Sequence, residues 1–189
     1  MKKELERWKL FFDATKALFV LSDELNAQDT PNWYYQELFY IKLASFINAD
    51  TIIYLNKLKA EFGDNIIMTE WLTCIHEGIH TIINNLQEEE LVFIQYRRTR
   101  AAHMFQDGYE YDPNNPNKTI VRILQEDDTL KPYIYSDAIR HIESVKSKYR
   151  NTVEFDKYLD RKLHPLLTNL RYDLNRIYNK IDASSQAEI

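Results

Sequence analysis

Turn-forming residues are scarce in this chain, and their scarcity limits the folds open to it. Only 3 Gly and 5 Pro occur among the 189 residues. Sheet-rich folds need many tight turns, which Gly and Pro supply, whereas long helices need few connections. Apolar residues make up 44% of the chain, which is enough for the core of one domain. We therefore expect an all-α protein built around a single core.

Apolar residues recur at helical spacing along most of the chain. The clearest stripe advances by alternating steps of four and three residues through Met68, Leu72, Ile75, Ile79, Ile82 and Leu86. Further helices are expected at about 3–26, 31–62, 87–105, 136–150 and 153–181, the last bent near Pro165. Residues 120–124 fit either a helical turn or a strand. The prediction is a bundle of five or six helices with long antiparallel neighbours, forming one domain over 1–182 with a disordered tail over 183–189.

The charge balance restricts the partners of the protein. With 24 Lys and Arg against 29 Asp and Glu, the net charge is −5. A mildly acidic chain is not a general nucleic-acid binder, so any such contact needs a local basic patch. The single cysteine, Cys74, excludes an internal disulfide and suits a reducing compartment. Since no run of about 18 apolar residues lacks a charge, we expect no membrane span and a cytoplasmic location.

One motif points to a metal. His76, Glu77 and His80 form an H-E-x-x-H pattern. Residues four apart share one face of a helix, so both imidazoles can bind one zinc ion while Glu77 polarises a bound water. This pattern predicts a zinc peptidase as an alternative function. The other interpretation is that His76 and His80 are hydrogen-bonded residues that flank the apolar stripe.

The zinc hypothesis lacks two features at the level of sequence. A catalytic zinc needs a third protein ligand. Glu88, Glu89 and Glu90 lie too far along the same helical rod to fold back. The remaining candidates are His103, Asp107 and Glu110, none with a recognisable pattern. Peptidases with this motif also resemble one another in having a small sheet, and the sequence does not predict a sheet here.

A second motif contains arginines followed by a histidine. Arg98 and His103 are separated by four residues, and Arg97 and His103 by five. The chain therefore resembles the HEPN superfamily, whose ribonuclease members carry Arg, four to six residues and His near the end of a long helix. The resemblance extends to the size and the all-helical organisation, over about residues 32–150. This chain departs from the commonest form, in which a polar Asn, Asp or His follows the Arg.

The resemblance implies a metal-independent ribonuclease or RNA-binding protein of a defence or toxin–antitoxin system. His103 would transfer protons as the general acid and base, and Arg97 or Arg98 would hold the scissile phosphate. Arg100 and Tyr109 are the expected substrate-binding residues, the latter by stacking on a base. The family implies a two-fold homodimer, RNA as the substrate, and an antitoxin or regulatory protein as a partner. No cofactor is expected in this hypothesis, whereas the peptidase alternative requires zinc.

A third class stays open beside the two enzymes. In this interpretation the arginines have only a structural role, because the helix dipole favours cations at a helix C-terminus. The protein would then be a non-catalytic helical interaction protein. We rank the ribonuclease first, because it agrees with an all-helical fold.

Overall fold

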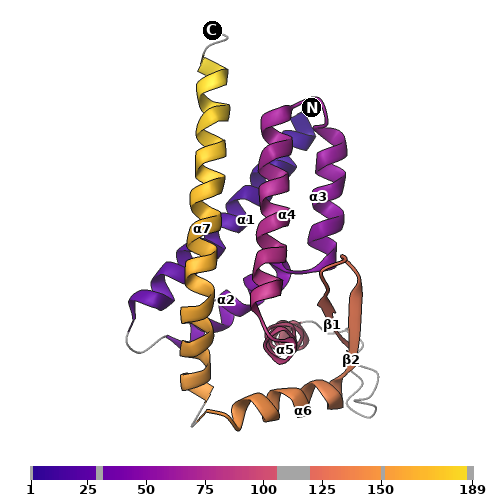
Figure 1. The fold of residues 1–189 in the computed structure, drawn as a ribbon, viewed down its shortest axis with the longest axis vertical. Helices are drawn as coiled ribbons and strands as arrows, with labels where there is room; N and C mark the ends of the chain where they lie inside the picture. The colour runs from indigo at the N-terminus through magenta and orange to yellow at the C-terminus, as the bar shows by residue number, and fades with distance from the viewer. Residues whose placement is uncertain (1, 29–31, 106–119, 150–151, 187–189) are drawn as a thin grey trace.

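The computed structural model describes residues 2–28, 32–105, 120–149 and 152–186, without the side chains of 2–9, 99–105, 120, 134–136, 145–146, 152 and 181–186. The elements in chain order are α1 (Lys2–Ala27), α2 (Trp33–Phe46), α3 (Ala49–Glu61), α4 (Ile66–Asn85), α5 (Glu88–Phe105), β1 (Ile120–Leu124), β2 (Leu130–Ile134), α6 (Tyr135–Lys146) and α7 (Thr152–Gln186). The described part of the chain therefore holds seven helices and one two-stranded sheet (Figure 1). The all-α prediction is confirmed.

Asparagine side chains define three of the helix starts. Asn32, Asn48 and Asn65 precede α2, α3 and α4, and each accepts a hydrogen bond from a backbone N–H in the first turn. Such a cap satisfies one of the unpaired N–H groups of a helix N-terminus. The helix expected over 31–62 is divided at Asn48, whose backbone is extended (φ −121°, ψ 153°). The chain bends by 53° between α2 and α3.

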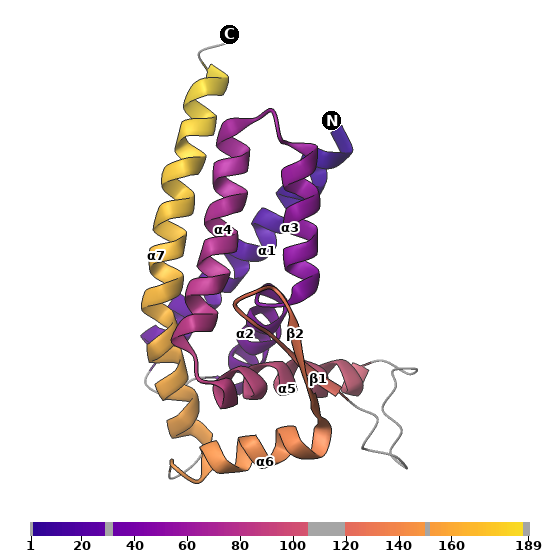
Figure 2. The same ribbon diagram turned by 45° about the vertical axis from the view of Figure 1, so that its right-hand side comes forward.

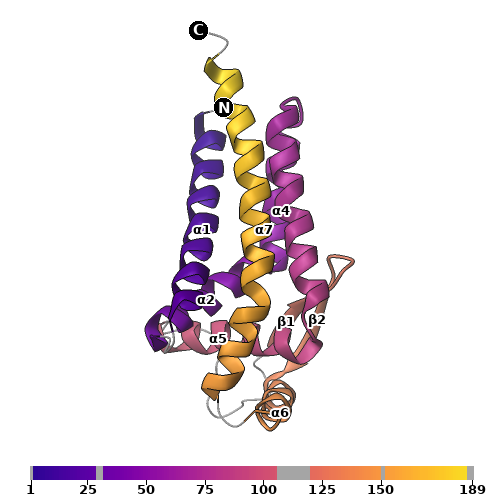
Figure 3. The same ribbon diagram turned by 60° about the vertical axis from the view of Figure 1, so that its left-hand side comes forward.

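The long helices stand upright, and the shorter elements cross their lower ends. The helix α7 lies between α1 and α4 and packs against both (Figure 3). The helix α5 runs across the lower end and packs on α2, with α6 beneath it (Figures 1 and 2). The strand β1 packs on α5, and the turn of the hairpin reaches α4, where Asp128 contacts His76 and His80.

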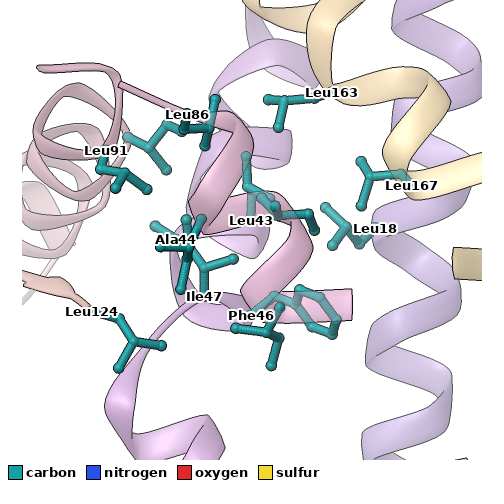
Figure 4. Packing of buried hydrophobic residues seen from close by; sticks show 14 of the residues in the cluster. Leu18, Leu43, Ala44, Phe46, Ile47, Leu86, Leu91, Leu124, Leu163 and Leu167 are labelled. Carbon is teal, nitrogen blue, oxygen red and sulfur yellow. The ribbon is translucent and has the colours of Figure 1, made fainter. Parts of the chain in front are cut away.

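Leucine-rich packing joins these elements into one core. Leu18 of α1, Leu43 of α2 and Leu163 of α7 are each at most 1% exposed and lie close together (Figure 4). Leu86 and Leu124 extend the same core toward α5 and the hairpin. These residues belong to one continuous cluster of buried side chains.

The hairpin settles the ambiguity of residues 120–124 in favour of a strand. The strands β1 and β2 pair antiparallel, from Ile120 opposite Ile134 to Leu124 opposite Leu130. Val121 and Ile123 are buried, whereas Arg122 between them is exposed, as expected of a half-buried strand. The expectation that the chain has no sheet is therefore wrong at this place.

The last helix is longer than expected. The helix α7 continues through Pro165 and reaches Gln186, so it includes residues 183–186, which were expected in the tail. Residues 187–189 lie outside the described part. Among the described residues, no single helix is long and apolar enough to cross a membrane, although the bent pair α2 and α3 together meets the length and composition required.

Candidate metal centre

His76 and His80 lie one turn apart on α4, on the side that faces the hairpin. Each histidine directly follows a residue of the buried stripe, Ile75 or Ile79, and both of these are 0% exposed. The two imidazoles are only partly buried, with side chains 24% and 22% exposed. Their Nε2 atoms are 3.2 Å apart, and the rings meet edge to face. The Nε2 atoms of the two rings therefore point into the same small volume.

The hairpin turn brings a carboxylate to these two imidazoles. The turn is closed by the Gln125 N–H donating to the Thr129 carbonyl, at 2.9 Å. Asp127 then accepts hydrogen bonds from both the N–H and the hydroxyl of Thr129, which lowers the pKa of Asp127. Asp128 takes a left-handed backbone conformation, with φ of 63°. Aspartate is among the few residues enriched there, and such conformations cluster at functional sites.

The three side chains form a compact triangle of metal-ligating atoms. Asp128 Oδ1 lies 3.0 Å from His80 Nε2 and 3.4 Å from His76 Nε2. A tetrahedral zinc centre has metal–ligand bonds of about 2.0–2.1 Å, which places its ligand atoms about 3.3 Å apart. The observed separations of 3.0, 3.2 and 3.4 Å fit such a centre, and without a metal they are also hydrogen-bond distances. Among the described residues, His76, His80 and Asp128 are the group of three such side chains close enough to share an ion.

The ligand set and its exposure define what this centre can do. Two imidazoles and a carboxylate are ligands of zinc and related divalent transition metals. Three protein ligands leave at least one coordination position open, as catalytic metal sites require and closed structural sites do not. The Asp128 side chain is 35% exposed, so solvent reaches the centre. A metal held here could bind and activate water.

Glu77 is not part of the triangle. It lines a groove between α4 and α7 together with Cys74, Gly78 and Asp173. Gly78 packs closely on this side, because a Cβ there would lie 2.5 Å from a methyl group of Leu170 and would force that side chain to move. Burial, with the carboxylates of Asp173 and Glu77 nearby, raises the pKa of the Cys74 thiol to about 11. The residues of the H-E-x-x-H pattern therefore lie on two sides of α4. The two histidines face the hairpin, and Glu77 lines the α4–α7 groove.

The structure places a third potential metal ligand, Asp128, beside the two histidines, and the sequence alone does not identify it. His103, Asp107 and Glu110 were the candidates, but their side chains lie outside the described part. Asp128 lies 48 residues beyond His80, in a segment that carries no metal-binding pattern. Its one usable signal is a polar turn, residues 125–129, that follows a short segment rich in β-branched residues, 120–124, as in many hairpins.

The arginine motif lies in the C-terminal half of α5. Arg97 donates to Asp156 at 2.9 Å and forms a second ion pair with Glu37. Its guanidinium also lies 4.6 Å from the centre of the Tyr40 ring. With a side chain only 12% exposed, Arg97 links α5 to α2 and α7. This favours Arg98, which is half-buried, as the arginine able to reach a phosphate.

The rest of the arginine motif cannot be placed. The side chains of Arg100 and His103, and the whole of Tyr109, lie outside the described part of the structure. The remaining described histidines have structural contacts. His141 packs edge to face on Tyr133. His164 Nδ1 lies 3.2 Å from the hydroxyl of Ser22, within hydrogen-bond distance.

Comparisons with known proteins leave the assignment to the site itself. No protein-family model, curated protein or solved structure matches this chain.

Proposed function

We propose that this protein is a metal-dependent hydrolase of the zinc class, with its metal bound by His76, His80 and Asp128. The single observation that carries the proposal is the triangle of ligand atoms with separations of 3.0 to 3.4 Å. Two separate elements, a helix and a hairpin turn, converge to form it. The left-handed conformation of Asp128 is common in short hairpin loops, and in this turn the Asp128 carboxylate lies beside the two imidazoles.

A metal at this centre supplies the chemistry of hydrolysis. It would lower the pKa of a bound water toward neutrality and polarise the bond to be cleaved. His76 and His80 contribute neutral ligands and Asp128 one negative charge, so a divalent ion keeps a net positive charge for that task. Because Glu77 lies in the α4–α7 groove, we do not expect it to act as the base, the role of the corresponding glutamate in H-E-x-x-H peptidases.

Cobalt substitution tests this proposal with a direct readout. Co²⁺ in a site of two nitrogens, one carboxylate oxygen and water gives intense visible absorption when the geometry is tetrahedral. We expect one equivalent of Co²⁺ to produce these bands in the wild type and in the control His141→Ala, which removes an imidazole outside the centre. Asp128→Ala should abolish the bands. Bands that persist in Asp128→Ala would refute the ligand set.

The metal should also be needed for turnover. In a screen of ester, amide and phosphoester substrates, we expect hydrolysis that is lost in chelator and restored by zinc. His80→Ala should lose this activity, whereas Glu77→Gln should keep it. A hydrolase activity that is lost in Glu77→Gln with zinc still bound would restore the peptidase alternative.

A ribonuclease of the HEPN type is the second candidate function. It is favoured by one observation: Arg97, Arg98 and His103 all belong to the last turns of α5, within an all-α fold. In this hypothesis Arg98 holds the phosphate, His103 transfers the proton, and a homodimer acts on RNA under an antitoxin or regulator in the cytoplasm. RNA cleavage in chelator that is lost in both Arg98→Ala and His103→Ala would establish it. Cleavage that requires metal would refute it.

A further inference from the structure

A cleft of about 580 Å³ is lined by residues that neighbour two of the three proposed metal ligands in sequence, although none of the three ligands lines it. It is formed by the end of α4, the start of α5 and the hairpin. Ile83 lines it one helical turn beyond His80, and Asp127 and Thr129 line it on either side of Asp128 in sequence. The same elements that hold the metal ligands therefore continue into the walls of the cleft. Small-molecule sites commonly have volumes of about 300–1,000 Å³.

The cleft has an apolar floor. Leu86, Leu91, Ile123 and Leu124 line it, and each belongs to the hydrophobic core. Leu86 and Leu91 lie near each other, and Leu124 lies on the hairpin side of the same cluster (Figure 4). An apolar floor favours binding of the hydrocarbon part of a ligand over binding of a polar, hydrated group.

The mouth of the cleft is acidic. Its charged lining residues are Glu88, Glu126 and Asp127, and among the described residues that line it there is neither Lys nor Arg. Lys131 forms an ion pair with Glu88 at 2.9 Å, which balances that carboxylate. Glu126 and Asp127 are exposed and keep the mouth negative. Such a potential attracts cations and repels anions.

We propose that this cleft binds a substrate with a positively charged group, an amine or a guanidinium, joined by a short apolar chain to the bond that is cleaved. The proposal rests on the proposed hydrolase function, because it places the reactive end of the substrate at the metal. The apolar floor would take the chain, and Glu126 and Asp127 would face the charge. Nucleic acid, which is anionic, is the wrong occupant for this cleft.

Three metal-chelating probes separate the cleft from the metal. The probes are hexanohydroxamic acid, its ω-amino derivative and its ω-carboxy derivative, titrated calorimetrically into the zinc-loaded full-length protein. Their hydroxamate groups are identical and bind the open metal position, so only the charge at the far end of the chain differs. We expect the amino probe to bind about 3- to 10-fold more tightly than the neutral one, the combined effect of two exposed charges. The carboxy probe should bind more weakly than both, and salt should narrow the differences.

Matched variants test whether the carboxylates of Glu126 and Asp127 cause the tighter binding of the amino probe. Glu126→Gln combined with Asp127→Asn should remove the advantage of the amino probe while the neutral probe binds as before. The asparagine keeps an oxygen that can accept the hydrogen bonds of Thr129, so the turn is preserved. The control is Glu24→Gln with Asp64→Asn, which removes the same two charges from parts of the chain that line no wall of the cleft. It should keep the full preference.

Failure of the two proposals gives different results. If the three probes bind with equal affinity, the cleft proposal is wrong while the metal centre stands. Tighter binding of the carboxy probe would also overturn it. If the protein takes up no zinc, or if no probe binds the zinc-loaded protein, the hydrolase proposal itself fails.

Discussion

The carboxyl of Asp160 gives the stability of this protein a pH dependence that can be worked from the structure. Asp160 is 7% exposed and lies among groups of three helices. From α2, Gln36 and the Tyr40 hydroxyl donate hydrogen bonds to it, each at 3.4 Å. Asp156 lies near it on α7, and Arg97 of α5 is already paired with Asp156. Burial and the charge of Asp156 raise the pKa of Asp160 from 3.8 to about 7.

The sign of the effect follows from that direction. Below the unfolded pKa, Asp160 is protonated in both states and costs nothing. As the pH rises toward the folded pKa, the unfolded chain loses the proton while the folded protein retains it, so the free energy of unfolding falls. Between about pH 5 and about pH 8, the loss from this one group is about 2.5 kcal/mol, since one pKa unit corresponds to about 1.4 kcal/mol.

The variant Asp160→Asn removes the titration and keeps a hydrogen-bond acceptor. We therefore expect its stability advantage over the wild type to grow by about 2.5 kcal/mol between about pH 5 and about pH 8 in urea unfolding. The control Asp13→Asn changes an exposed carboxyl on α1 and should run parallel to the wild type. Parallel curves for Asp160→Asn as well would refute the reasoning.

Three further outcomes follow from the packing of α4, α5 and α7. Gly78→Ala should lower the free energy of unfolding by about 1–2 kcal/mol, because overpacking against Leu170 exceeds the gain in helix propensity; a stabilised variant in urea unfolding would contradict this. Arg97→Met should destabilise by about 3–5 kcal/mol, since it leaves the buried Asp156 without its cation; a change below about 1 kcal/mol would show that the pair is not buried in solution. Native Cys74 should react with iodoacetamide far more slowly than in the urea-unfolded chain, because its raised pKa leaves little thiolate; equal rates by mass spectrometry would disprove its burial.

The sequence predicts what depends on local pattern. The stripe from Met68 to Leu86 defines α4, and its four-residue spacing places His76 and His80 on one face. The scarcity of Gly and Pro predicts the all-α class. The break at Asn48 is local too, because asparagine is a preferred N-cap, but the apolar residues on both sides continue the helical pattern and hide it.

The third ligand depends on tertiary structure, so the sequence alone cannot identify it. Asp128 meets His80 only because β1 packs its buried residues on α5 and thereby sets the hairpin beside α4. Pro132 in β2 also obscures the strand, although a two-stranded sheet has only edge strands, which tolerate proline. The ion-pair partners of Arg97 are equally hidden in the sequence, because Glu37 and Asp156 each lie about 60 residues away from it.

Zinc stoichiometry tests the central claim most directly. Tag-free wild-type protein and its Asp128→Ala and Glu77→Gln variants are incubated with zinc, desalted and measured by elemental analysis. Our account predicts one zinc per chain in the wild type and in Glu77→Gln, and a loss of most of the metal in Asp128→Ala. Zinc retained in full by Asp128→Ala, or absent from the wild type, would contradict the proposed centre.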